Sequence, residues 1–92
     1  MSQHQAFLRL WTAVLIQAIR DVETGNEQER NSALAWMFGG IPSARVSFAA
    51  VCSWLEIDPD QVRAALLRRK KFAFCYNRYN RWRQATKDRI EA

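Results

Sequence analysis

The chain has 92 residues and a net charge of +5, with 49% hydrophobic and 12% aromatic residues. This length predicts one domain, residues 1–92, and the apolar content excludes a chain that is disordered throughout. The first twenty residues are apolar but interrupted by Arg9, Gln17 and Arg20, so they predict neither a membrane span nor a signal peptide and favour a cytoplasmic protein.

The first predicted helix runs from Ser2 to about Thr24. Ser2 and Gln5 fit a capping box, and Gly25 follows the last turn, as glycine often does after a helix. The apolar positions at helical spacing are Leu8, Trp11, Leu15, Ala18, Ile19 and Val22. This stripe is wide enough to form a core face or a dimer face, and we favour the core.

A second helix is predicted to begin at Asn26, which is a good cap and has Glu29 three residues later. Its expected inner face is formed by Ala33, Leu34, Met37 and Phe38. Trp36 lies off that face and is expected to pack against a neighbouring helix. Glycine, proline and serine in residues 39–43 then predict a break that lasts to about Val46.

Residues 47–71 are interpreted as a short helix, a tight turn and a second helix, which is the pattern of a helix-turn-helix. Ser47 is a suitable N-cap for the first helix, and Asp58 followed by Pro59 is a suitable start for the second. Ile57 lies at the turn. A helix-turn-helix needs small residues in its first helix where the two helices cross, and Ala50 and Cys52 meet this need.

The second helix of this pair is predicted to have distinct faces. Its inner face comprises Val62, Ala65 and Leu66, and its outward residues are Gln61, Arg63, Ala64 and Arg68. Two features depart from the pattern. Glu56 occupies a turn where many such proteins have glycine, and Asp58 and Asp60 place negative charge near the expected DNA. The alternative is an ordinary pair of packed helices in a bundle.

Charge is distributed unevenly along the chain. Residues 1–60 contain four basic and seven acidic side chains, whereas residues 61–92 contain ten basic and two acidic ones. A basic stripe that begins on a candidate recognition helix is typical of nucleic-acid binding proteins. The alternative is that these charges form a solvated face that keeps the protein soluble. Because the basic stripe coincides with the predicted helix pair, we favour binding.

Residues 72–92 form a basic, aromatic C-terminal extension, which we predict to be helical because no second strand is available for pairing. Its aromatic residues alternate with arginines and asparagines. Such a pattern suits phosphate contacts combined with stacking on bases. The alternative, which we favour for the aromatic rings, is that they cover the core while the arginines stay in water.

No pattern of catalytic or metal-binding residues is present. His4 is the single histidine, which leaves no Ser-His, Cys-His or multi-His arrangement. Gly39 and Gly40 lack the Gly-Lys-Ser/Thr of a phosphate-binding loop. Cys52 and Cys75 have no partner at metal-ligand spacing and are expected to be buried thiols in a reducing compartment. We therefore expect no enzymatic activity, no cofactor and no metal.

The segment from Ser47 to Arg63, SFAAVCSWLEIDPDQVR, resembles a pattern seen in small phage and prophage proteins of DNA-binding type. The similarity covers 17 of the 92 residues, a little under a fifth of the chain. It implies a small helical protein that is encoded by a mobile element and acts as a helix-turn-helix regulator.

These observations predict an all-α fold, a small bundle of four to five helices containing a helix-turn-helix, that binds double-stranded DNA and regulates transcription. Gln61 and Arg63 are expected to reach base edges, since both can make bidentate contacts, with Ala64 beside them. The residues expected to hold phosphates are Arg68, Arg69, Lys70 and Lys71, extended by Arg78, Arg81 and Arg83 in the tail.

Two other functions fit the same residues. The protein could dock on an acidic host protein, or it could bind RNA or single strands through the arginine-rich, aromatic tail. A homodimer is also compatible with so small a domain, because small domains gain stability from oligomerisation.

Overall fold

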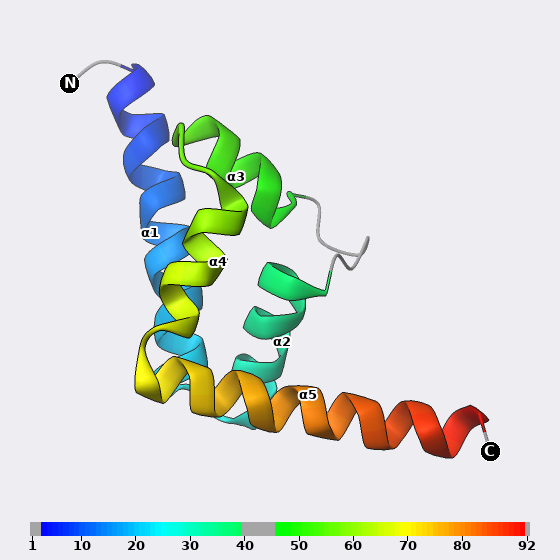
Figure 1. Ribbon diagram of the computed structural model, residues 1–92. Helices are drawn as coiled ribbons and strands as arrows, with labels where there is room; N and C mark the ends of the chain where they lie inside the picture. Colours follow the sequence, from blue (N-terminus) through cyan, green and yellow to red (C-terminus); the bar gives the residue numbers. More distant parts are fainter. Residues whose placement is uncertain (1–2, 40–45, 92) are drawn as a thin grey trace.

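The protein folds as five helices within the residues that the computed structural model describes, 3–39 and 46–91, with side chains described as far as Ala85. The helices are α1 (Gln3–Thr24), α2 (Glu27–Phe38), α3 (Phe48–Trp54), α4 (Pro59–Leu67) and α5 (Lys70–Glu91) (Figure 1). No strand occurs in this part of the chain. The expected all-α bundle is therefore confirmed.

Local hydrogen bonds explain where the helices begin. The side chain of Asn26 accepts a hydrogen bond from the Glu29 N–H at 2.8 Å, and the Glu29 carboxylate accepts one from the Asn26 N–H at 3.1 Å, which completes a capping box. The Ser47 hydroxyl accepts from the Ala50 N–H at 3.0 Å. Both predicted caps are confirmed. Ser2, the predicted cap of the first helix, lies outside the described residues.

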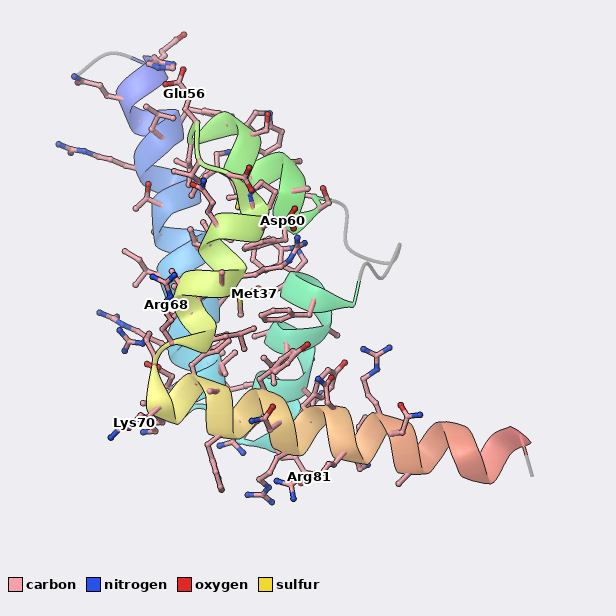
Figure 2. The ribbon with its side chains drawn as sticks, viewed as in Figure 1. Met37, Glu56, Asp60, Arg68, Lys70 and Arg81 are labelled. Atoms are coloured by element: carbon pink, nitrogen blue, oxygen red, sulfur yellow. The ribbon has the colours of Figure 1, made fainter. Side chains whose placement is uncertain are left out.

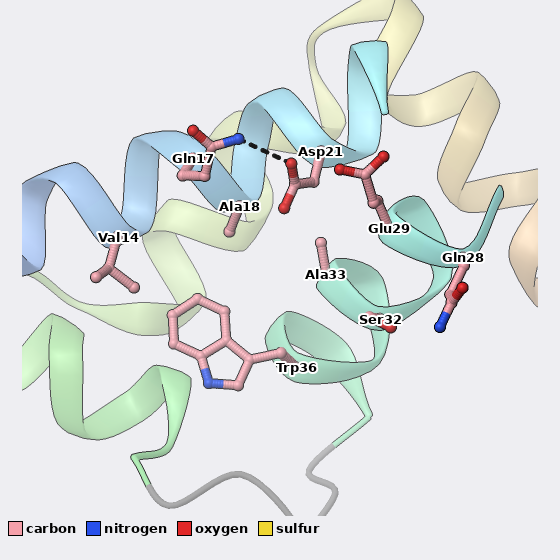
Figure 3. A pocket seen from close by; sticks show the side chains of 9 residues that line it. All are labelled: Val14, Gln17, Ala18, Asp21, Gln28, Glu29, Ser32, Ala33 and Trp36. Carbon is pink, nitrogen blue, oxygen red and sulfur yellow. Dashed lines mark hydrogen bonds between the residues drawn. The ribbon is translucent and has the colours of Figure 1, made fainter. Parts of the chain in front are cut away.

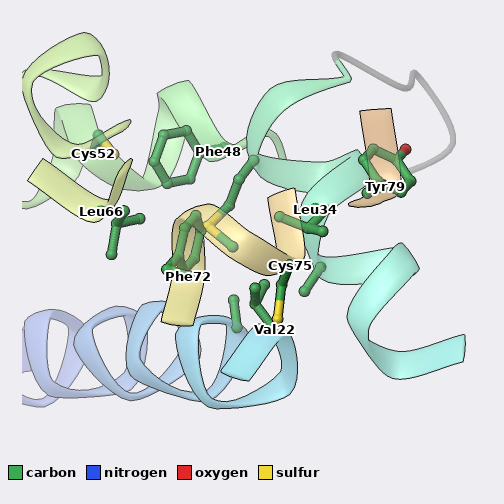
Figure 4. Packing of buried hydrophobic residues seen from close by; sticks show 11 residues of the cluster. Val22, Leu34, Phe48, Cys52, Leu66, Phe72, Cys75 and Tyr79 are labelled. Carbon is green, nitrogen blue, oxygen red and sulfur yellow. The ribbon is translucent and has the colours of Figure 1, made fainter. Parts of the chain in front are cut away.

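The core lies where α1, α2 and α5 meet the α3–α4 pair (Figure 4). Its largest fully buried side chains are Phe48, Phe72, Leu34, Met37, Val22, Val51 and Cys52. Ala18 and Val22 confirm that the apolar stripe of α1 faces the core in the second half of that helix. Burial also raises the pKa of the Cys52 thiol, and Cys75 is a second buried free thiol.

Trp36 connects α2 to α3, as its position off the inner face of α2 predicts. Its indole N–H donates a hydrogen bond to the Val46 carbonyl at 2.8 Å, and its ring meets Phe48 edge to face at 5.4 Å between centroids. These contacts fix the indole between the two helices.

The described part of the molecule is elongated, with extents of 54 × 28 × 24 Å. Figure 1 shows why: the first turns of α1 and the second half of α5 extend beyond the bundle. On α5, Tyr79 is buried, whereas the side chains of residues 81–85 are exposed. Among the described helices, none has both the length and the apolar character to cross a membrane.

Candidate nucleic-acid interface

The connection between α3 and α4 contains a left-handed residue. Glu56 has φ of 58°, and its N–H bonds to the Ser53 carbonyl at 3.1 Å, while the Ile57 N–H bonds to the Cys52 carbonyl at 2.9 Å. This hydrogen-bond pair is a Schellman motif, in which glycine is the usual left-handed residue. The backbone thus adopts here the conformation that glycine favours, although the side chain is glutamate.

The N-terminus of α4 is held by Asp58. One carboxylate oxygen of Asp58 accepts hydrogen bonds from the N–H groups of Asp60 at 2.8 Å and Gln61 at 3.2 Å, and Pro59 occupies the first turn. This start confirms the predicted cap. It leaves the Gln61 side chain exposed to solvent.

The solvent-facing side of α4 differs in one residue from the prediction. Val62 and Leu66 face the core as expected, but Ala65 is exposed and does not belong to the inner face. The exposed residues that share one helical face are Gln61, Ala64, Ala65 and Arg68, which we call the α4 face. Its two alanines leave the middle of this surface free of bulky side chains.

Arg63 is not outward-pointing, which corrects the prediction. Its Nε donates to the Met37 carbonyl at 2.7 Å, one guanidinium N–H group donates to Asp60 at 2.9 Å, and the guanidinium lies 4.9 Å from the centre of the Phe48 ring. Met37 belongs to the last turn of α2, where carbonyls lack helical partners and attract cations. Arg63 therefore ties α4 to α2, and it neutralises part of the acidic N-terminus of α4.

Arg69 is also committed to the fold. Its Nε and one terminal nitrogen each donate to a different oxygen of Glu23 at 2.8 Å, and the Glu23 side chain is only 11% exposed. The hydrogen bond from Arg69 is the main cause that lowers the pKa of Glu23. This bidentate pair joins α1 to the chain between α4 and α5.

The sequence predicted a second helix that runs to Lys71, so that Arg68, Arg69, Lys70 and Lys71 would all lie at its end. The structure instead contains a break between two helices at this point. Helix α4 ends at Leu67, and α5 begins at Lys70 in a new direction (Figure 1). Arg68, Lys70 and Lys71 are exposed around this junction, and their side chains form no hydrogen bond or ion pair with other described residues. They are therefore available to bind anions. We call them the junction cations. After the hydrogen bond and the charge of Arg69, the charge of Lys71 also contributes to lowering the pKa of Glu23.

The three tail arginines do not share one surface. Arg81 is exposed and points away from the bundle, on the same side of α5 as Lys70 (Figure 2). Arg78 is exposed on another side, where it lines a notch with Glu27 of α2. Arg83 lies over the Tyr79 ring, 5.6 Å from its centre. A single flat partner cannot meet all three.

Two features of this region escaped the sequence reasoning. Glu23 lies 46 residues from Arg69, and no local pattern announces that ion pair. Phe74 is 60% exposed. Its exposure depends on which side of α5 packs against the bundle, and the sequence did not indicate that side.

The described residues contain no group of three His, Cys, Asp or Glu side chains placed to hold a metal ion. Comparisons with protein-family models, curated proteins and solved structures found no match to this chain.

Proposed function

We propose that the protein binds double-stranded DNA through the α4 face and the junction cations, and that it acts as a small transcriptional regulator. The observation that carries this proposal is the continuity of the two surfaces: a capped, exposed helix face ends at Arg68, and Lys70 and Lys71 follow directly. The proposal also follows the expectation from residues 47–63, whose sequence resembles a pattern seen in small phage DNA-binding proteins.

Each part of this surface has a chemical role in the proposal. Gln61 can make a bidentate contact with adenine, and Ala64 can contact a thymine methyl group. Arg68, Lys70 and Lys71 would neutralise phosphates, which supplies affinity without sequence preference. Arg81 would extend the phosphate contacts along α5, whereas Arg63 and Arg69 support the surface from behind.

The test is a fluorescence anisotropy titration of a labelled duplex at several salt concentrations. The four proposed phosphate contacts, Arg68, Lys70, Lys71 and Arg81, predict a slope of about −3.6 in the plot of log K against log salt concentration. Replacing Lys70 and Lys71 together by alanine should reduce the slope to about −1.8. Arg9→Ala, which removes an exposed cation from the far end of α1, is the matched control and should leave the slope unchanged.

Gln61→Ala tests the base contact separately. It should lower the preference among duplex sequences by about 1–3 kcal/mol while preserving the salt slope. The proposal fails if no duplex binds at low salt, or if the slope is the same with and without the two lysines.

A second candidate function is single-strand or RNA binding by α5. Phe74 and Trp82 are 60% and 54% exposed, and Arg78 lies one helical turn along α5 from each of them. Exposed aromatic rings beside cations can stack on unpaired bases. Tighter binding of single strands than of duplex, lost on Phe74→Ala, would replace the duplex proposal with this one.

A further inference from the structure

A groove of about 510 Å³ lies between α1 and α2 (Figure 3). One end is apolar, with Val14 and Trp36, and the small side chains of Ala18 and Ala33 line its middle. Acidic side chains from both helices, Asp21 and Glu29, lie at the other end. None of the described residues that line the groove is basic, so an occupant must combine an apolar side chain with positive charge.

The walls of this groove are held in place by the fold. Trp36 is fixed by its hydrogen bond to the Val46 carbonyl. Gln17 donates to one carboxylate oxygen of Asp21 at 2.9 Å, and Glu29 uses one oxygen in its capping box. Each carboxylate keeps its second oxygen without a hydrogen bond to the described residues. The groove is therefore preformed and has two acceptors to offer.

The projecting half of α5 carries the complementary groups. Arg78 and Trp82 are exposed and separated by four residues, so they lie on one side of the helix, with Ala85 completing the row. One face of the Trp82 ring stacks on Tyr79 at 6.2 Å between centroids, and the residue remains 54% exposed. We call these three residues the lateral row of α5.

We propose that the lateral row of α5 from one copy docks in the α1–α2 groove of a second copy, and that the exchange is reciprocal. Trp82 would cover the apolar end beside Trp36, and Arg78 would face Asp21. Arg78 and Trp82 meet their own α2 at a notch lined by Glu27, Arg30 and Asn31, none of which lines the groove. Beyond this notch α5 projects from the bundle, so its lateral row does not fill the groove of its own chain (Figure 1). Because each copy offers both surfaces, a two-fold arrangement makes the contact twice and closes at a dimer.

This proposal goes beyond DNA binding and does not depend on it, since the groove and the lateral row lie outside the proposed DNA surface. Sedimentation equilibrium of the full chain without DNA measures the dimer dissociation constant. Trp82→Ala should raise that constant at least tenfold, because a buried tryptophan dominates such contacts. Ile16→Ala is the control: it removes an exposed apolar side chain from α1, outside both the groove and the lateral row, and should change the constant less than twofold.

A charge exchange gives the decisive test. The Arg78→Glu and Asp21→Arg proteins should each be monomeric at concentrations where the parent is a dimer, since each places like charges together. Mixed in equal amounts they should form a heterodimer, because both reciprocal contacts again pair opposite charges. Circular dichroism establishes that each variant is folded. A monomeric parent, a dimer insensitive to Trp82→Ala, or a mixture that stays monomeric would each overturn the proposal.

Discussion

The left-handed backbone at Glu56 leads to a stability prediction with an unusual sign. A side chain with a Cβ atom in this conformation costs about 1–2 kcal/mol, which glycine avoids. Glycine also adds freedom to the unfolded chain, which costs about 0.5–1 kcal/mol. We therefore expect Glu56→Gly to increase the free energy of unfolding by about 0.5–1 kcal/mol.

Thermal and urea unfolding followed by tryptophan fluorescence measure this change, since Trp54 lies two residues away at the end of α3. For a domain of this size the gain corresponds to a rise in Tm of about 2–8 °C. Glu56→Gln is the first control: it removes the negative charge beside Asp58 but keeps the Cβ atom, so it isolates the electrostatic part.

Ser53→Gly is the second control, because Ser53 is exposed and helical in the same short helix. There glycine should lower stability by about 0.5–1 kcal/mol. If Glu56→Gly destabilises the protein as Ser53→Gly does, the left-handed turn and the reasoning built on it are refuted.

Three further predictions concern residues that hold the fold. Arg69 lowers the pKa of Glu23 below its usual 4.5. Their pairing therefore stabilises the folded protein above pH 4.5, and this stabilisation disappears as the pH falls through the lowered pKa of Glu23. Glu23→Gln should thus reduce the free energy of unfolding at neutral pH but not in strong acid. Arg63→Lys should cost about 1–2 kcal/mol in urea unfolding, because lysine cannot reproduce the forked contacts, while the duplex affinity of the folded protein stays unchanged. Phe72→Ala should cost about 3–5 kcal/mol, measured by the loss of Tm, because Phe72 is fully buried.

The helix starts were predictable from sequence because caps act over three or four residues. Asn26, Ser47 and Asp58 each satisfy N–H groups of the turn that follows, and these contacts depend on little beyond local spacing. The apolar period of α1 likewise predicted its buried residues near Ala18 and Val22. The uneven charge along the chain is a property of the sequence alone.

Tertiary structure alone decided which cations remain available. Arg63 and Arg69 lie in the same basic last third of the chain as Lys70, yet their partners, the Met37 carbonyl and Glu23, come from helices far away in the chain. Because α4 ends at Leu67, α5 starts in a new direction at Lys70. This direction determines the side of the molecule on which Arg81 projects (Figure 2). Local sequence determined the helices of this protein because capping and periodicity are short-range. Which cations stay free for a partner depends on tertiary packing, because a side chain forms a hydrogen bond or an ion pair only when the fold brings the other group close to it.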